Sequence, residues 1–326
     1  MTAPAAAPVS GHMSRRAWAL FAAMGLIWGV PYLFIKIAVE QISPAEIVGL
    51  RTLIGGLVLL PLALRGGSFR SALRAWPFVL AFAVIEMAVP WLLLGRAEQH
   101  VASGFAGLML ASVPIFGNIV AFALGDRTSF SRVRVLGLVV GVSGVAALVG
   151  LDSLSGTLDP VAVVELLLVA LCYAGGPAIA SRKLAHVPSL GVIALSLLFA
   201  AVLYLPVTIG SVGAGLPAPK VVASVLVLAL VCTALAFVLF FRLIAEAGPV
   251  RATVITFVNP AVAVALGVIV LGEPLTWGIV LGFPLVLLGS YWATRPTRRV
   301  DDASPSSPAA VPDPDGLETE DARHDV

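Results

Sequence analysis

The chain has 326 residues, of which 59% are hydrophobic and only 12% are charged, and its formal net charge is +2. Soluble domains carry about 25% charged residues, and the mean hydropathy of this chain is +1.03. These values exclude a soluble globular domain and predict that most of the chain lies in lipid.

Ten apolar runs follow one another along the chain, and a membrane-spanning helix needs roughly 20 such residues. The runs lie near residues 17–39, 45–64, 75–95, 102–124, 133–150, 160–181, 189–211, 221–243, 250–271 and 276–294. Their length exceeds that of a strand, and no alternating ten-residue pattern indicates an outer-membrane barrel. The predicted fold is an all-α membrane protein with ten transmembrane helices.

The two ends of the chain differ from these runs in composition. Residues 1–16 begin with an Ala- and Pro-rich stretch, and residues 296–326 are acidic with several prolines, so both are predicted to be disordered tails. The first run is too long for a signal peptide, lacks an Ala-x-Ala cleavage site and is followed by nine more spans. It is therefore interpreted as an uncleaved first helix.

The basic residues predict how the chain is oriented in the membrane. If the N-terminus is cytoplasmic, the loops on that side hold fifteen Arg and Lys residues, whereas the opposite loops hold only Arg96 and Lys220. The positive-inside rule then places both termini in the cytoplasm. The expected location is the cell (cytoplasmic) membrane.

The two halves of the chain share a pattern of prolines, loop acids and glycines. Pro114 and Pro260 lie 146 residues apart, and the Gly125-Asp126 and Gly272-Glu273 pairs lie 147 apart. The pattern predicts two five-helix repeats, residues 17–150 and 160–295, joined by a loop at 151–159. Because five is odd, the second repeat crosses the membrane in the opposite sense. Inverted repeats are a recurrent transporter architecture with a binding site near the midplane; chance similarity between apolar helices is the alternative.

Several segments carry a more specific signal. They are Trp28-Gly29 with Lys36, Leu50-Arg51, Leu124-Gly-Asp126, and Asn259-Pro260 with Leu271-Gly-Glu-Pro-Leu-Thr276. In these segments the chain resembles the EamA family of the drug/metabolite transporter superfamily, over residues 17–294. The resemblance implies ten helices, both termini inside, and movement, often outward, of small metabolites such as amino acids or of drug-like amphiphiles. Family members often have Glu where this chain has Asn259 and Asp126, and the first difference removes an intramembrane charge.

Glu86 lies in the middle of the third run. A charged carboxylate at that depth costs roughly 2.5–3.5 kcal/mol, so it must face a cavity, bind a partner or take up a proton. Its counterpart in the second repeat is Ala234. One hypothesis is that Glu86 contacts the substrate or carries a coupling proton; the alternative is a structural hydrogen bond to a neighbouring helix.

Aromatic and amide side chains supply the other candidate substrate-binding residues. Trp28 and Tyr32 are one helical turn apart and are expected to share a face, and Tyr173 occupies the matching place in the sixth run. They could line a cavity, or pack and lie in the interfacial aromatic belt. Asn118 and Asn259 need partners for both ends of the amide, from a ligand or from another helix.

Charged residues near the ends of the runs have simpler explanations. Lys36 and Arg51 are expected to snorkel toward headgroups, although either could bind an anionic group. Turns and capping are expected to explain the acids at helix junctions, which are Glu98, Asp126, Glu246 and Glu273.

Glycines and prolines suggest where helices touch and bend. Gly137-x-x-x-Gly141 and Gly278-x-x-x-Gly282 fit the close-packing motif, within one chain by default or between two copies, so a monomer or a homodimer is expected. Candidate bending points for alternating access are Pro31, Pro90, Pro114, Pro177, Pro206 and Pro260.

No pattern favours catalysis. The four histidines lie in tails or loops, which excludes a buried Ser–His dyad, and there is no His-Glu-x-x-His or Walker-type motif. No catalytic residue, metal, cofactor or nucleic-acid partner is expected, and the expected partners are a small-molecule substrate and membrane lipids. The rival hypotheses are a receptor or assembly subunit that does not transport, and an intramembrane enzyme.

Overall fold

The computed structural model describes residues 13–125, 132–154, 158–211 and 215–294. These residues form helices and short connections, with no strand in the described ranges. The predicted tails and Asp126 lie outside these ranges, apart from residues 13–16. Ser14 accepts a hydrogen bond from the backbone N–H of Ala17 at 3.0 Å, so the first helix begins at Arg15, within the predicted tail.

A helix occupies each of the ten predicted runs. Nine helical segments of at least 18 residues are apolar enough to cross a membrane, and a tenth, Trp277–Ala293, has 17 residues. In the described part of the chain the nine candidate spans are Arg15–Ala38, Pro44–Arg65, Trp76–Ala97, Ser103–Ala123, Arg132–Asp152, Pro160–Lys183, Ser189–Gly210, Pro219–Ala247 and Val254–Leu271, and the shorter apolar helix Trp277–Ala293 follows them. The protein is therefore a multi-pass membrane protein. The fifth helix, α9 (Arg132–Leu154), runs on into the predicted connecting loop.

Three spans are interrupted, each beside a proline. The first consists of α1 (Arg15–Gly29) and α2 (Pro31–Ala38), and the fourth of α7 (Ser103–Leu110) and α8 (Val113–Ala123). The ninth consists of α14 (Pro249–Ala252), the 3₁₀ segment η4 (Thr253–Phe257) and α15 (Asn259–Leu271). Proline lacks the N–H that would continue the preceding helix but fits the first turn of a new one.

Not every predicted bending point interrupts its helix. Pro31, Pro90, Pro114 and Pro260 each stand in the first turn of a new helix. Pro177 and Pro206 lie inside continuous helices, α10 (Pro160–Lys183) and α11 (Ser189–Gly210). The sixth span is thus a continuous helix past Tyr173 and Pro177.

The third and eighth spans each contain a stretch of π-helix. The third is α5 (Trp76–Ala83), η1 (Val84–Ala88) and α6 (Val89–Ala97). The eighth is α12 (Pro219–Leu226), η3 (Val227–Leu235) and α13 (Ala236–Ala247). Glu86 lies in η1 and its counterpart Ala234 lies in η3. Such stretches are rare and are frequent at functional sites.

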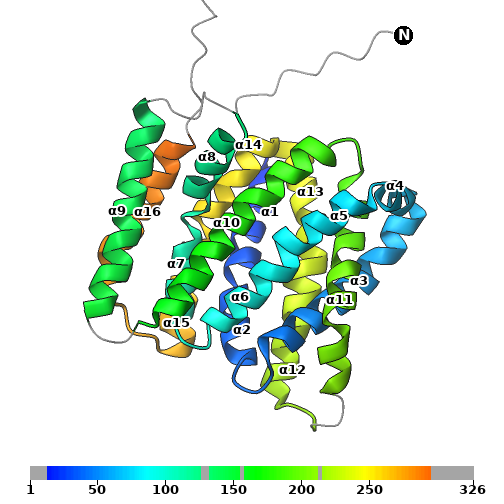
Figure 1. Ribbon diagram of the computed structural model, residues 1–326, viewed down its shortest axis with the longest axis horizontal. Helices are drawn as coiled ribbons and strands as arrows, with labels where there is room; N and C mark the ends of the chain where they lie inside the picture. Colours follow the sequence, from blue (N-terminus) through cyan, green and yellow to red (C-terminus); the bar gives the residue numbers. More distant parts are fainter. Residues whose placement is uncertain (1–12, 126–131, 155–157, 212–214, 295–326) are drawn as a thin grey trace, which may run out of the picture. The chain divides into compact units, whose positions relative to one another are not determined.

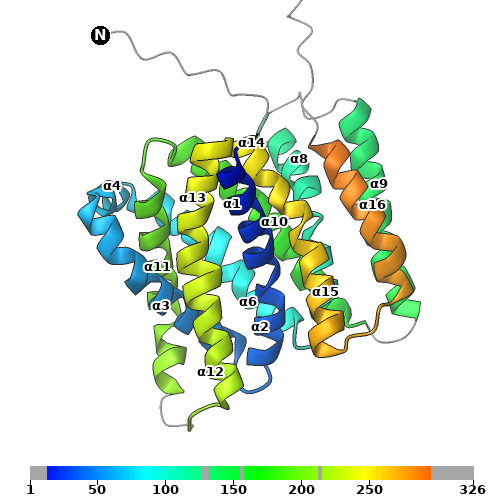
Figure 2. The same cartoon turned by 180° about the vertical axis from the view of Figure 1, so that it is seen from behind.

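Helices from the first half pack mainly against helices from the second (Figures 1 and 2). In the second, fourth and fifth spans, α3 (Pro44–Arg65) packs on α11, α7 on α15, and α9 on α16 (Trp277–Ala293). In the remaining spans, α1 and α2 pack on α13 and α12, and α6 packs on α10. A short helix, α4 (Ser68–Arg74), lies between the second and third spans and also packs on α11.

Glycines bring α9 and α16 close together. A Cβ placed on Gly289 would overlap the backbone of Gly141, and one placed on Gly144 would lie 2.6 Å from the backbone nitrogen of Val286. Such an approach requires residues without side chains. The prediction that these glycines serve close packing within one chain is confirmed.

Candidate substrate-binding site

Arg51 of α3 is the one buried arginine among the described residues, with 6% of its surface exposed. Its Nε donates a 2.7 Å hydrogen bond to Oγ1 of Thr233 in η3, and that hydroxyl donates to the carbonyl oxygen of Leu228 at 2.8 Å. The guanidinium carbon lies 3.7 Å from the ring centroid of Trp91 in α6, a cation–π contact. The expectation that Arg51 snorkels toward headgroups is therefore wrong.

The guanidinium of Arg51 still has hydrogen-bonding capacity to offer. Among the described residues it makes only the bond to Thr233 and no ion pair. An arginine carries several further N–H donors in a fixed fork that matches a carboxylate. A buried cation without an anionic partner is unfavourable, so this arrangement favours an anionic ligand.

Two tyrosines lie near this guanidinium. Tyr32 of α2 and Tyr173 of α10 are each close enough to Arg51, and to one another, for electrostatic interaction between their side chains. The structure thus brings two of the predicted site residues, from the first and sixth spans, to one place around Arg51.

Glu86 belongs to the same group. Its carboxylate is close enough to Tyr173 and Cys172 of α10 to act on both side chains. Oε2 is buried and has no hydrogen-bond partner among the described residues. Gly176 leaves the room for this carboxylate, because any Cβ at that position would overlap Oε2. Within the described ranges, Glu86 and Arg51 form no ion pair with each other.

The structure shows different contacts for Trp28. It lies at the end of α1, before the interruption at Val30, and its ring packs against Phe240 and Phe237 of α13, with centroids 4.7 and 6.1 Å away. Tyr32 lies beyond the interruption, and its ring packs beside Gly107 of α7. The helix break therefore separates two residues that were predicted to share one face.

The two asparagines join helices. Nδ2 of Asn118 in α8 donates to the carbonyl oxygens of Pro114, at 2.8 Å, and of Ala293 in α16, at 3.1 Å. With its amide in the orientation that satisfies its neighbours, Asn259 donates from Nδ2 to Ile255, at 2.9 Å, and to Gly25 of α1, at 3.1 Å. In both cases a neighbouring helix supplies partners for the amide.

A second polar group lies where α2 and α6 end and α7 begins. Nζ of Lys36 donates to the carbonyl oxygens of Glu98 and Val101 at 2.6 and 2.7 Å. The Glu273 carboxylate accepts from the backbone N–H and hydroxyl of Ser103, at 2.7 and 3.0 Å, and from the N–H of Gly104, at 3.1 Å. It therefore caps the N-terminus of α7. Capping was the role predicted for this acid. Lys36 binds carbonyls and does not snorkel.

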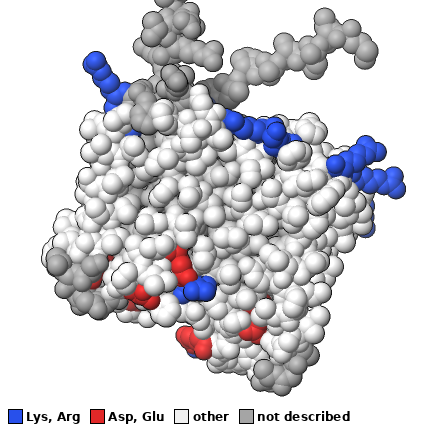
Figure 3. All heavy atoms as spheres, in the orientation of Figure 1, with Lys and Arg blue, Asp and Glu red and all other residues white. Residues whose placement is uncertain are grey.

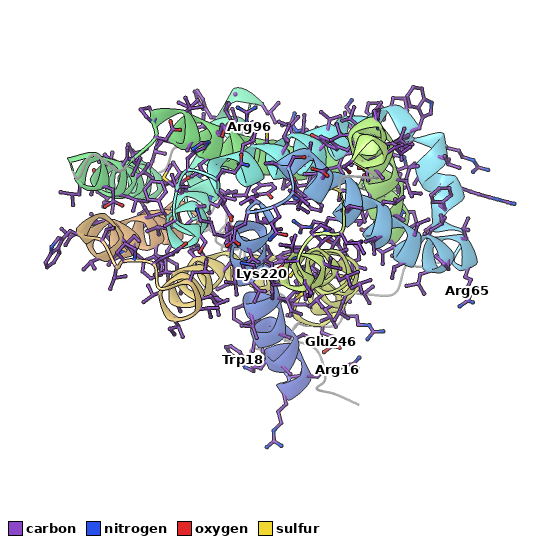
Figure 4. The ribbon with its side chains drawn as sticks, turned by 90° about the horizontal axis from the view of Figure 1, so that it is seen from below. Arg16, Trp18, Arg65, Arg96, Lys220 and Glu246 are labelled. Carbon is purple, nitrogen blue, oxygen red and sulfur yellow. The ribbon has the colours of Figure 1, made fainter. Side chains whose placement is uncertain are left out.

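Glu98 differs from the other junction acids. It is 0% exposed, and neither carboxylate oxygen has a hydrogen-bond partner among the described residues. Burial raises the pKa of Glu98 well above its usual value, Lys36 acts to lower it, and the Glu273 carboxylate adds to the rise. Capping therefore does not explain this residue. Glu246, in contrast, forms an ion pair with Arg16 at 2.9 Å (Figure 4).

Sequence reasoning missed the roles of Trp91, Thr233 and Glu98. The repeat offered a signal for Thr233, because it precedes Ala234, the counterpart of Glu86. No local pattern marks Trp91 or Glu98: a tryptophan in an apolar run and a glutamate at a helix end are both common. Their significance comes from neighbours on other helices.

Comparison with known proteins is consistent with this architecture. The model of the EamA-like transporter family matches residues 16–150 and 161–295. The chain belongs to the EamA-like transporter family. Two matched segments of this length also account for the two repeats found in the sequence.

Relatives of this EamA-like transporter are named as transporters. The chain is 32% identical over 286 residues to the "Uncharacterized inner membrane transporter YedA" of Escherichia coli strain K12, covering 84% of this chain and 90% of the relative. It is 26% identical over 271 residues to the "Uncharacterized transporter YvbV" of Bacillus subtilis, covering 82% and 88%. A solved structure described only as "Crystal structure of protein" has a TM-score of 0.61 at 20% identity, covering 85% of this chain and 96% of that one, which shows the shared fold.

Proposed function

We propose that this EamA-like protein is a secondary transporter in which two inverted five-helix halves enclose one solute site. The contacts between spans support a two-fold relation between the halves, and the odd number of helices in each half makes that relation an inverted one. Exchanging the halves leaves the pairs of second with seventh, fourth with ninth and fifth with tenth spans unchanged. The same exchange turns the contact between the first and eighth spans into a contact between the sixth and third spans. Both of these contacts are present. A two-fold relation between the halves accounts for this pattern.

The distribution of charge supports the proposed orientation. On the face drawn in Figure 3, most of the Lys and Arg side chains lie along the upper edge, whereas the acidic side chains, with a basic group beside them, lie toward the lower edge. The positive-inside rule assigns the basic end to the cytoplasm, so both termini are cytoplasmic in the proposal. The protein then lies in the cytoplasmic membrane, and export is the direction that the family resemblance implies.

The solute site in this proposal consists of Tyr32, Arg51, Glu86, Trp91 and Tyr173. The observation that carries it is the buried guanidinium of Arg51 and the buried Oε2 of Glu86, which both act on Tyr173 without pairing with each other. A solute with a carboxylate for the guanidinium fork and a cationic group for Glu86 would satisfy both. Small amino acids and amphiphiles of that charge pattern fit this chemistry.

Alternating access would move the interrupted helices around this site. The breaks at Pro31, Pro114 and Pro260 lie in spans that pack across the two halves. We place Trp28, Asn118 and Asn259 at these joints, where they connect neighbouring helices, and not in contact with the solute. The glycine seam between α9 and α16 occupies faces that a dimer would otherwise use, which favours a monomer.

Transport by purified protein in lipid vesicles tests the proposal. A panel of amino acids and metabolites is screened for uptake and efflux, with and without an imposed pH gradient. Flux in the wild type and its loss in Arg51→Gln are expected. Arg65→Gln is the matched control, because Arg65 is exposed at the end of the same helix.

Three results would contradict the proposal. Equal flux in Arg51→Gln and Arg65→Gln would remove Arg51 from the solute site. Proteolysis or lipid turnover without flux would favour an intramembrane enzyme. Specific binding of a solute without any flux would favour a receptor or assembly subunit.

A further inference from the structure

Glu98 lies where four elements meet. It follows the last residue of α6, and its own carbonyl oxygen is held by Lys36 from α2. The N-terminus of α7 follows after a short turn, and Glu273, in the turn after α15, binds that N-terminus. These elements come together in the lower half of Figure 1, at the end of the bundle opposite α14.

The carboxylate of Glu98 has neither solvent contact nor a hydrogen bond to stabilise its charge, although Lys36 lies near enough to act on it. It is 0% exposed, and both oxygens lack a hydrogen-bond partner among the described residues. An ionised carboxylate in such surroundings is strongly disfavoured, and taking up a proton removes the charge. The geometry therefore suits the neutral acid.

The charged groups around Glu98 are occupied. From α2, Lys36 faces it with an ammonium group that is already bonded to two carbonyl oxygens, and Tyr32 lies near enough to interact electrostatically. From the turn after α15, Glu273 is bonded to the N-terminus of α7. The sequence neighbours are paired elsewhere, Arg96 with Glu165 at 2.7 Å and His100 with Asp159 at 3.8 Å.

A metal ion does not fit this place. The described residues include no group of three or more His, Cys, Asp or Glu side chains that could hold one. The two carbonyl oxygens that could complete a cation site, those of Glu98 and Val101, are already bound by Lys36. A proton requires no such shell of ligands, because it forms a single covalent bond to one carboxylate oxygen.

We propose that Glu98 is a proton-binding site, filled while the ends of α2, α6, α7 and the turn after α15 are closed against one another, and emptied when they separate. On closing, a proton from the adjoining aqueous phase forms an O–H bond with the carboxylate. On opening, water reaches the carboxyl group and the proton returns to that phase. Closure of this end of the bundle is thereby a proton-uptake step.

Infrared spectroscopy tests whether Glu98 holds a proton. The full-length protein is reconstituted in ether-linked lipid, which has no ester carbonyl, and the carboxylic-acid C=O band is followed with pH and after deuterium exchange. The expected result is a band that persists above the ordinary Glu range and is lost in Glu98→Gln. Glu86→Gln is the matched control, because Glu86 is the other acid among the described residues with a buried carboxylate oxygen that has no hydrogen-bond partner. A band unchanged in Glu98→Gln overturns the proposal.

Hydrogen exchange tests whether the proton is linked to closure. After correction for the intrinsic effect of pH, exchange of Ser103–Leu110 in the wild type is expected to rise as pH rises, because ionised Glu98 favours separation. In Glu98→Gln this dependence disappears, and α11 serves as the internal reference in both proteins. An equal pH dependence of Ser103–Leu110 in wild type and variant overturns the link.

Two further variants keep the test decisive if Glu98→Gln folds poorly. Lys36→Gln removes a positive charge and should shift the midpoint of the infrared titration to higher pH. Glu273→Gln removes a negative charge and should shift it to lower pH. Unchanged midpoints in both variants overturn the proposal. None of these measurements uses a solute, so their failure is distinct from a failure to observe transport.

Discussion

Glu86 and Glu98 are the two acids among the described residues with a buried carboxylate oxygen that has no hydrogen-bond partner, and they lie in contrasting surroundings. Glu86 shares its site with Arg51, whose guanidinium has donors left over, and with aromatic rings. Glu98 lies beside Lys36, whose ammonium is already bonded to two carbonyl oxygens. A molecule that carries both a carboxylate and a cationic group can pair with Arg51 and Glu86. Glu98 needs only a proton to become neutral. Glu86 lies within the third span and Glu98 just beyond its end, and the bonding state of the neighbouring cation distinguishes what each acid can bind.

The largest effect should come from Arg51→Lys. Lysine keeps the charge but loses the fork and the Nε bond to Thr233. Two charge-assisted hydrogen bonds are worth about 3 kcal/mol together, so the apparent affinity for a carboxylate solute should fall roughly 100-fold. Concentration-dependent flux in vesicles measures this, with Arg65→Lys as control. Unaltered affinity in Arg51→Lys would mean that the solute does not use the guanidinium fork.

Filling the space beside Glu86 should have the next largest effect. The Cβ of Gly176→Ala overlaps Oε2, whereas that of the neighbouring Gly175→Ala lies 3.4 Å from Ile85, an ordinary contact. Displacement of the carboxylate should lower flux roughly tenfold, or about 1.4 kcal/mol. Both variants are compared in the same flux assay at equal amounts of protein. Similar flux in the two would show that the position of Glu86 is unimportant.

Glu98→Gln should change how stability depends on pH. Because the pKa of Glu98 is raised in the folded protein, its contribution is intact below the ordinary value near 4.5 and is lost as pH rises through the raised value. The wild type should therefore lose stability relative to the variant over that window, by up to about 1.4 kcal/mol per pH unit. Thermal unfolding across pH measures the difference. A constant difference at every pH would refute the raised pKa.

The smallest effect should come from Thr233→Val. The change removes the hydroxyl that orients Nε of Arg51 but leaves the guanidinium over Trp91. A loss of about 1 kcal/mol, or a few-fold in apparent affinity, is expected in the flux assay. Thr208→Val is the control, because in the described part of the chain that hydroxyl bonds only within its own helix, to the carbonyl oxygen of Tyr204. A loss as large as that of Arg51→Lys would mean that Thr233 contacts the solute directly.

Part of the candidate site could be read from the sequence. Tyr32, Glu86 and Tyr173 were predicted; the two tyrosines lie near Arg51, and Glu86 lies near Tyr173. Trp28, Asn118 and Asn259 were predicted with them, but their described contacts are with neighbouring helices. The sequence does not distinguish a polar or aromatic residue that binds a ligand from one that contacts another helix. Either partner can satisfy the same hydrogen-bonding or aromatic groups of the side chain.

The sequence by itself determined where the membrane-length helices lie and where several of them break. A stretch of about 20 apolar residues in lipid must satisfy its own backbone and therefore becomes helical, and proline lacks the N–H that would continue a helix. The tertiary structure alone decided which buried charges have partners. The Thr233 hydroxyl comes to Arg51 from 182 residues away, and Lys36 binds the carbonyl oxygens beside Glu98 across the bundle. Pairing depends on which helix faces lie against one another, and that is decided by packing between segments far apart in the chain.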